Sequence, residues 1–155
     1  MRESIDKFFS SGAYAVVGVS QKRHKFGNQV FREMKQRGFT VYPVHKTLSS
    51  VEGERCFPTV SDLPETVQSV VIVLHPEDSE MVVAQCKWKG IQNIWLQPGA
   101  ESDSIVAYAH EYDLNLVHDL CVLMFLEPVK SLHSVHRWVN KIVGKYPSET
   151  EPPKG

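Results

Sequence analysis

The amino-acid sequence predicts an α/β protein with a mainly parallel β-sheet and helices on both of its faces. Short runs of β-branched residues alternate with amphipathic segments along the chain, which is the pattern that β-α-β units produce. The runs are apolar throughout, as in Val70 to Leu74, and strands buried on both faces have this character. The length of 155 residues, with 42% hydrophobic and 23% charged residues, is typical of one ordinary globular domain.

The first strand is expected from Ala13 to Val19, because a continuous apolar run suits the centre of a sheet. A helix with apolar residues on one face follows from about Gly27 to Arg37. Gly38 then stands where a helix end needs a left-handed backbone. Phe39 to Val44 is expected to form the second strand.

The middle of the chain begins with turn chemistry from Leu48 to Thr66. Within it we expect a short edge strand around Arg55 to Phe57 and a capped turn at Ser61 to Pro64. Ser69 to Leu74 is the next buried strand.

A helix is expected to begin at Pro76, since proline is tolerated in the first turn, and to end at Gly90. We expect this helix to direct Met81, Val82 and Cys86 toward the sheet.

The last elements are a strand from Asn93 to Leu96, a helix from Glu101 to Tyr112 and a strand from Leu114 to His118. A helix from about Ser131 to Val143 is expected to close the domain. The strongly apolar Val122 to Leu126 has two open interpretations: it packs the closing helix onto the sheet, or it forms an exposed pairing surface. One domain over residues 1–145 and a disordered, proline-rich tail over residues 146–155 follow.

This order of elements implies a Rossmann-like, doubly wound sheet of five to six strands with right-handed crossovers. In such sheets ligands bind beyond the carboxyl ends of the strands, at the switch point beside the first strand. Four loops lie there: Gly18 to Gly27, Pro43 to Lys46, His75 to Glu77, and Gln97 to Glu101.

The first of these loops has the chemistry of a phosphate site. Gly18 permits a sharp turn and a close approach of a ligand, and Ser20 supplies a hydroxyl and a free amide. Gly27 lies at the helix start, where unpaired amides and the helix dipole favour an anion. The loop also concentrates positive charge, in Lys22, Arg23, His24 and Lys25.

The spacing of the glycines indicates which nucleotide is bound. A dinucleotide fingerprint needs G-x-G-x-x-G and an acidic residue near the end of the second strand, which holds a ribose diol. Here the second strand ends in Pro43, Val44, His45 and Lys46, without an acid. NAD is therefore disfavoured, and a ligand with an extra ribose phosphate, CoA or NADP, fits the charge better. No G-x-x-x-x-G-K-[ST] motif is present, which excludes a P-loop.

Five motifs in a fixed order carry a resemblance to a known family. The segments VVGVSQKRHKFGNQVF, GFTVYPVH, GERCFPTVSDLPETV, NIWLQPGA and LVHDLC resemble those of the small stand-alone CoA-binding domain proteins. These proteins are similar to the nucleotide-binding domain of the succinyl-CoA synthetase α subunit. The resemblance covers roughly residues 13–121.

The resemblance implies that the Gly-x-Ser loop wraps the phosphates of CoA or acyl-CoA and that Pro43 and Val44 lie near the adenosine. His45 stands where the family usually has asparagine. The W-L-Q-x-G motif matches Trp95 to Gly99. Together with the loop positions, the predicted cofactor-binding residues are Gly18, Val19, Ser20, Lys22, Arg23, His24, Lys25, Gly27, Pro43, Val44, His45, Leu74, His75, Pro76, Gln97, Pro98 and Gly99.

Composition excludes several other partners. A net charge of −1 argues against a general nucleic-acid or membrane-surface role. No apolar run approaches the ~20 residues of a membrane span, and residues 1–12 have no apolar signal core. The three widely spaced cysteines fit reduced thiols, so we expect a cytoplasmic protein, and its protein partner stays open.

Metal binding and catalysis are weakly indicated. His133 and His136 have metal-ligand spacing without a further ligand, so no metal site is predicted. His118 and Cys121 are interpreted as part of a packed turn, not as a thiolate pair.

The alternative function is an NADP-binding or acyl-CoA-dependent enzyme that uses the same site. Its candidate catalytic groups are His75, Cys121 and His24, none of which has a partner in the sequence. We therefore favour a binding protein and assign no catalytic residue.

Overall fold

A computed structural model describes residues 1–126 of the chain. Its centre is a five-stranded sheet in the order β2-β1-β5-β6-β7, in which all neighbouring strands are parallel. The strands are β1 (Ala13–Val17), β2 (Val41–Val44), β5 (Val67–Ile72), β6 (Asn93–Leu96) and β7 (Asn115–Val117). The predicted Rossmann-like fold is confirmed. Because β1 pairs with both β2 and β5, the switch point lies beside β1.

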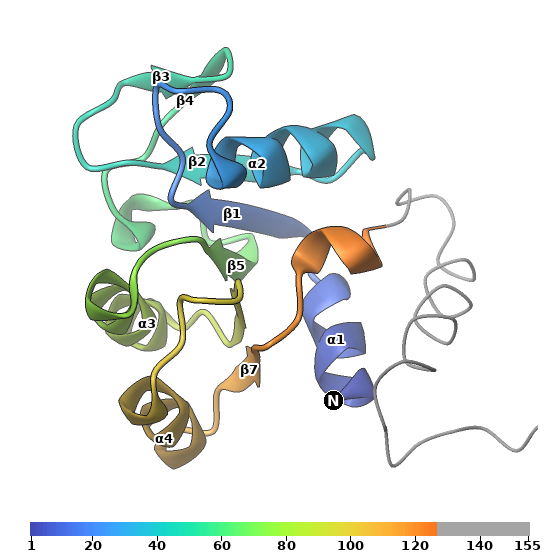
Figure 1. Cartoon of the computed structure of the whole chain (residues 1–155), viewed down its shortest axis with the longest axis vertical. Helices are drawn as coiled ribbons and strands as arrows, with labels where there is room; N and C mark the ends of the chain where they lie inside the picture. The colour runs from blue at the N-terminus through green and yellow to red at the C-terminus, as the bar shows by residue number, and fades with distance from the viewer. Residues whose placement is uncertain (127–155) are drawn as a thin grey trace, which may run out of the picture.

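Helices cover both faces of the sheet (Figure 1). One face carries α1 (Arg2–Phe9), α2 (Phe26–Gln36) and the 3-10 turn η2 (Val122–Phe125). The other carries α3 (Pro76–Lys89), α4 (Asp103–Glu111) and the 3-10 turn η1 (Val60–Asp62). None of the helices described within residues 1–126 is long and apolar enough to cross a membrane.

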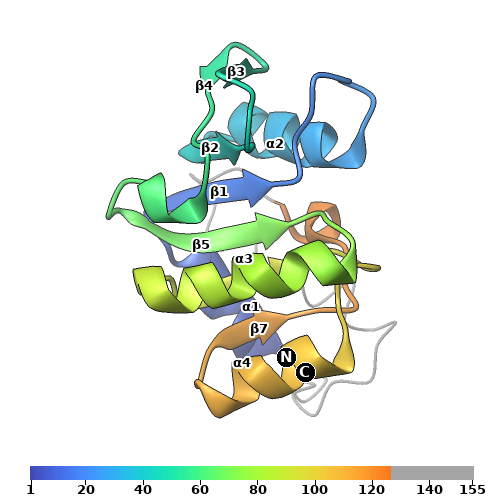
Figure 2. The same cartoon turned by 90° about the vertical axis from the view of Figure 1, so that its left-hand side faces the viewer.

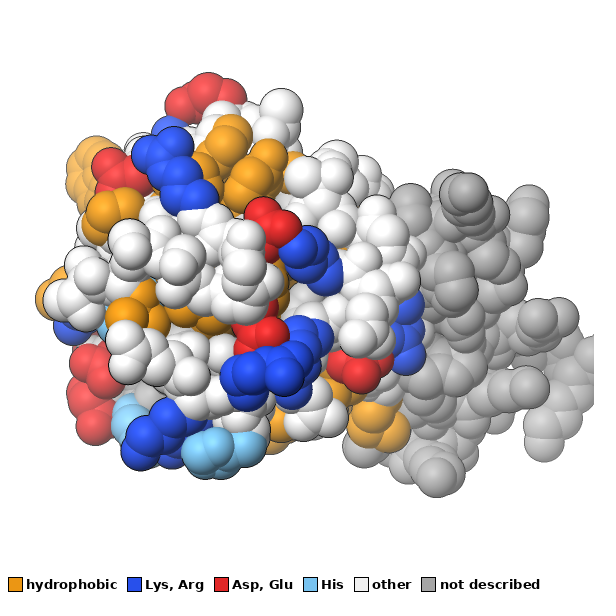
Figure 3. Space-filling view, turned by 90° about the horizontal axis from the view of Figure 1, so that it is seen from above, with side chains coloured by type: hydrophobic (Ala, Val, Ile, Leu, Met, Phe, Trp, Pro, Cys, Tyr) orange, Lys and Arg blue, Asp and Glu red, His pale blue; other side chains and the backbone are white. Residues whose placement is uncertain are grey.

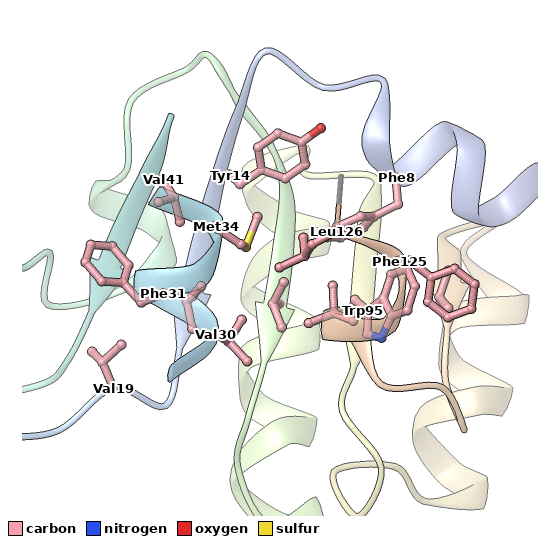
Figure 4. Packing of buried hydrophobic residues seen from close by; sticks show 14 of the residues in the cluster. Phe8, Tyr14, Val19, Val30, Phe31, Met34, Val41, Trp95, Phe125 and Leu126 are labelled. Carbon is pink, nitrogen blue, oxygen red and sulfur yellow. The ribbon is translucent and has the colours of Figure 1, made fainter. Parts of the chain in front are cut away.

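The core on the α1 side is aromatic, and Figure 4 shows how its side chains interlock. The Trp95 ring lies 5.2 Å from the Phe8 ring and 5.5 Å from the Phe125 ring, measured between centroids. The Trp95 indole is fully buried, and its Nε1 donates to the Leu120 carbonyl at 2.7 Å. This bond satisfies the one polar atom of the side chain and fixes the chain just before η2.

The apolar segment Val122 to Leu126 is part of this core, since Val122, Phe125 and Leu126 are buried. It covers the sheet directly as a 3-10 turn, which decides against an exposed pairing surface. The helix predicted from Ser131 to Val143, and the ends of the domain and tail, lie outside the described residues.

Helix α3 differs from the prediction in the side that it buries. Val83 and Cys86 face the core, whereas Met81 is 65% exposed. Met81 lies two residues before Val83, and such neighbours stand about 200° apart around a helix with 3.6 residues per turn. Met81 was therefore assigned to the wrong face.

Two elements were absent from the prediction. Helix α1 buries Ile5 and Phe8, and an eight-residue helix depends on such packing because it is marginal alone. The turn-rich middle segment forms an antiparallel hairpin, β3 (Ser50–Val51) and β4 (Glu54–Arg55), where one short edge strand was expected. Only Phe57 pairs with the main sheet there, through a bridge to Val44.

Two glycines permit the close approach of the backbone at the end of β1. Gly18 has φ 120°, and a Cβ on it would lie within 3.0 Å of the Val73 carbonyl oxygen. A Cβ on Gly27 would lie within 3.0 Å of the Gly18 carbonyl oxygen. The start of α2 thus packs on the end of β1. The loop between Gly18 and Gly27 therefore begins and ends at the same place.

We predict that Gly27→Ala lowers the free energy of unfolding by about 1 to 3 kcal/mol, because the added methyl collides with backbone that has no rotamer to change. Chemical denaturation of the purified protein measures the effect. Gly12→Ala is the control, since a Cβ there meets no atom within 4 Å, and its effect should be near zero. Equal stability of the two variants would contradict the close contact at Gly27.

Candidate functional site

The carboxyl ends of the parallel strands lie at one edge of the molecule, and the loops after β1 and β5 leave from this edge (Figure 2). A cavity of about 390 Å³ opens there beside the switch point. Its wall includes Gly18 and Val19 after β1, Val44 and His45 at the end of β2, and Leu74 after β5. Together with a second, neighbouring hollow, all four predicted loops contribute to cavities at this edge.

The cavity is lined by both apolar and polar residues. The apolar lining consists of Val17, Val19, Val44, Pro58, Val60, Leu74, Met81 and Val82. The polar lining consists of His45, Lys46, Thr47, Thr59, Asp78 and Gln85. Met81, which the sequence placed against the sheet, instead belongs to this lining. A flat apolar group with polar edges matches such a surface.

A second hollow of about 400 Å³ lies beside the first, at the ends of β5 and β6. The predicted residues His75, Gln97, Pro98 and Gly99 line it. Leu74 and Asp78 line both spaces. The two hollows are thus neighbours along the carboxyl edge of the sheet.

The Gly-x-Ser loop is held by Asn28, a buried residue in the first turns of α2. Asn28 Oδ1 accepts the Ser20 amide at 2.7 Å, and Asn28 Nδ2 donates to the Ser20 carbonyl at 2.7 Å. One side chain therefore satisfies both backbone groups of Ser20. The Ser20 hydroxyl in turn accepts the Lys22 amide at 3.1 Å, which leaves the loop in a defined shape.

Glu52, at the tip of the β3–β4 hairpin, contacts the same loop. Its carboxylate accepts from Arg23 Nε at 3.2 Å, from Arg32 Nη1 at 2.9 Å and from Asn28 Nδ2 at 3.3 Å. Burial raises the pKa of Glu52, but the hydrogen bonds from Asn28, Arg32 and Arg23 and the charge of Arg23 outweigh this effect. The net pKa of Glu52 lies below its ordinary value of 4.5.

The remaining cations of the loop point outward. Lys22, His24 and Lys25 are exposed, and no ion pair within residues 1–126 involves them. Figure 3 shows Lys or Arg side chains beside His side chains at one edge of the molecule. The first turn of α2 contains no acidic residue, whereas that of α3 contains Glu77 and Asp78. Of these two helix starts, α2 favours an anion more strongly.

Two hydrogen bonds to the His45 side chain explain how histidine replaces the asparagine that the family usually has there. Its Nδ1 accepts the amides of Thr47 and Leu48, each at 3.1 Å. An asparagine oxygen makes the same kind of contact with the amide two residues later. Since Nδ1 accepts, the proton of the neutral ring is on Nε2.

The side chain of Gln97 also makes its hydrogen bonds within the protein. Its side chain is 3% exposed, with Oε1 accepting the Val122 amide at 2.7 Å and Nε2 donating to Cys121 Sγ at 3.5 Å. His118 Nδ1 lies 2.6 Å from Asp119 Oδ2, and among the described residues no hydrogen bond joins His118 to Cys121. No group of three metal-ligating side chains occurs within residues 1–126, and His133 and His136 lie outside them.

The structure thus brings the predicted residues together in three places. Gly18, Val19, Val44, His45 and Leu74 line the first cavity, and His75, Gln97, Pro98 and Gly99 line the second hollow. Ser20 and Arg23 border the gap between the loop and the hairpin. Lys22, His24, Lys25, Gly27, Pro43 and Pro76 line none of these three spaces.

Sequence reasoning missed Asn28, Glu52 and the contribution of α3 to the cavity. Asn28 lay inside a segment interpreted only as helix, although a polar residue on a buried helix face is a signal that it holds a neighbour. Glu52 carried no local signal, because its partners lie 20 or more residues earlier. Asp78, Val82 and Gln85 line the cavity because of the way α3 packs.

Comparison with known proteins identifies the class to which this fold and site belong. A profile of the CoA binding domain matches residues 12–127, which is most of the chain. The chain therefore belongs to the CoA binding domain family. This confirms the resemblance that the five motifs carry.

The curated relatives include large ligases. The chain is 26% identical over 129 residues to the α subunit of acetate–CoA ligase (ADP-forming) II from Pyrococcus furiosus, covering 76% of this chain and 28% of that subunit. It is 26% identical over 149 residues to the 4-hydroxybutyrate–CoA ligase (ADP-forming) of Nitrosopumilus maritimus, covering 88% of this chain and 21% of that ligase. The chain therefore spans less than a third of either relative.

A solved structure of similar size also has this fold. A conserved hypothetical protein from Pyrococcus furiosus superimposes with a TM-score of 0.70 at 30% identity, covering 72% of this chain and 96% of that protein. The domain thus also occurs as almost the whole of a small protein.

We predict that the ion pairs of Glu52 make stability depend on pH. A carboxylate with a lowered pKa in the folded state stabilises fully above its unfolded value, near 4.5, and this contribution is lost as the pH falls through the folded pKa. Glu52→Gln should lower the free energy of unfolding by about 1 to 3 kcal/mol at pH 7 and should show a shallower loss below pH ~5. Denaturation between pH 3 and pH 7 measures both effects, with the exposed Glu65→Gln as control. An unchanged slope in Glu52→Gln would contradict the assignment.

Proposed function

We propose that this protein binds CoA or an acyl-CoA at the carboxyl edge of the sheet, and that it acts as a carrier or sensor of that ligand. The observation that carries the proposal is the 390 Å³ apolar cavity beside Gly18, next to a helix start rich in positive charge. The family to which the chain belongs supports the choice of ligand. Because the chain spans less than a third of its ligase relatives, the proposal extends to binding and not to ligation.

The phosphates of the ligand bind at the loop between Gly18 and Gly27. Both glycines let backbone segments pack closely, which holds the start of α2 beside the end of β1. The unpaired amides of this helix start favour phosphate oxygens. Lys22 and Lys25 have no carboxylate partner among the described residues, and they offset the phosphate charge.

The adenosine occupies the apolar cavity, where Val44, Leu74 and Val82 form its walls. The neighbouring hollow, which shares Leu74 and Asp78 with the cavity, receives the pantetheine arm. The family to which the chain belongs favours CoA over NADP as the ligand of this pair of hollows.

We predict that native mass spectrometry shows one CoA per chain, and that CoA or acetyl-CoA raises the thermal midpoint. At a CoA concentration about 100 times the dissociation constant, the free energy of unfolding should rise by about 2.7 kcal/mol. NAD and NADP, tested at the same concentrations, should shift the midpoint much less. Stabilisation by NADP without stabilisation by CoA would refute the proposal.

We predict that Val82→Trp weakens CoA binding about tenfold or more, which corresponds to ~1.4 kcal/mol or more of binding free energy, because an indole fills the adenosine cavity. Isothermal titration calorimetry measures the affinity. Glu80→Trp is the matched control, since Glu80 is exposed on the same helix and is not part of the cavity lining. If both variants bind CoA like the unmodified protein, the ligand lies elsewhere.

A further inference from the structure

Glu52 is an acid enclosed among the basic residues of the proposed ligand site. Its side chain is only 7% exposed, although its partner Arg23 is 74% exposed. It contacts Arg23, Arg32 and Asn28 at once, at distances from 2.9 to 3.3 Å. A carboxylate that repels phosphate would be unfavourable here unless it served another purpose.

The backbone conformation at Glu52 indicates that side-chain contacts, and not the turn itself, favour glutamate at this position. Glu52 and Gly53 are the two central residues of the hairpin, and both have positive φ, 53° and 77°. Such two-residue hairpins favour asparagine, aspartate or glycine at the first position, because other side chains are strained there. A strained backbone conformation persists where the surrounding contacts hold the residue in place.

The contacts of Glu52 extend to the Gly-x-Ser loop. Asn28 Nδ2 divides its two protons between the Ser20 carbonyl and Glu52, so Glu52 orients the amide that holds Ser20. Arg32 binds Glu52 and also donates to the Arg23 carbonyl at 2.8 Å. Asn28 and Arg32 lie one turn apart on α2, which places both toward the hairpin. Ser20, through Asn28, and Arg23 are therefore both tied to the same carboxylate.

We infer that Glu52 is a positioning residue of the CoA site, an inference that rests on the proposed function. Glu52 holds the loop in its ligand-ready shape by binding Arg23 and Asn28. Arg23 then serves the loop and not the ligand, which revises the role that the sequence suggested for it. The phosphates are contacted by Lys22, Lys25 and the amides at the start of α2.

A double-mutant cycle on CoA affinity tests this division of roles. Glu52→Gln and Arg23→Ala should each raise the dissociation constant about 5- to 10-fold, and the double variant should exceed either one by no more than about twofold, because both break the same contact. Lys22→Ala should weaken CoA binding by the same factor in the Glu52→Gln variant as in the unmodified protein. If Arg23→Ala weakens binding equally in both backgrounds, Arg23 contacts the ligand and the inference is wrong.

Glu54→Gln is the matched control, since Glu54 lies in the same hairpin and pairs with Lys35 of α2. It should leave CoA affinity unchanged. A loss equal to that of Glu52→Gln would mean that attachment of the hairpin matters and that the contact of Glu52 with the loop does not.

Hydrogen exchange without ligand separates this inference from the proposed function. In Glu52→Gln, the amides of residues 19–25 should exchange at least about fivefold faster than in the unmodified protein, while Glu54→Gln leaves them unchanged. Failure of the unmodified protein to bind CoA would refute the proposed function whatever the exchange shows. Normal CoA binding with unchanged exchange and affinity in Glu52→Gln would refute only the role of Glu52.

Discussion

The close approach of two backbone segments at the end of β1 is the constraint on which the site depends. Gly18 lies against the Val73 carbonyl, and Gly27 lies against the Gly18 carbonyl, with no room for a side chain in either contact. The start of α2 is therefore held directly on the end of β1. The eight residues between the glycines form a closed loop whose amides and cations stay at the switch point. A side chain at Gly27 would separate the helix from the strand, and one at Gly18 would push the end of β1 away from the segment after β5.

The polar groups around the loop divide into two sets with different surroundings. Asn28, Glu52 and Arg32 are buried or half-buried, and they bond to one another and to the backbone of the loop. Lys22 and Lys25 are exposed and have no carboxylate partner among the described residues. Buried charges need partners because desolvation is costly, whereas exposed cations remain free to meet an anion. A loop that looks uniformly basic in sequence thus contains one cation, Arg23, that is paired with Glu52, beside Lys22 and Lys25, which have no carboxylate partner among the described residues.

The sequence predicted the sheet well because each parallel strand is a continuous apolar run, and the ends of α3 were indicated by Pro76 and Gly90. It failed where burial depends on contacts distant in sequence. Met81 and Val83 are both apolar residues on one helix, and only the packing of α3 decides that Val83 faces the core while Met81 borders the cavity. Helix α1 was missed for a related reason, since a short helix is stabilised by the aromatic core that it joins.

The sequence by itself determined the doubly wound fold and the family, and it predicted the place of the ligand site and a preference for CoA over NAD. The fold and the predicted ligand follow from local patterns: apolar runs, glycine spacing, positive charge after the first strand, and the absence of an acid after the second. The family follows from the resemblance of five motifs in a fixed order. The tertiary structure alone decided which cations are free, which residues of α3 line the cavity, and that Glu52 contacts a loop more than 20 residues before it. An ion pair or a cavity wall exists only once the sheet brings distant segments together, so no local pattern encodes it.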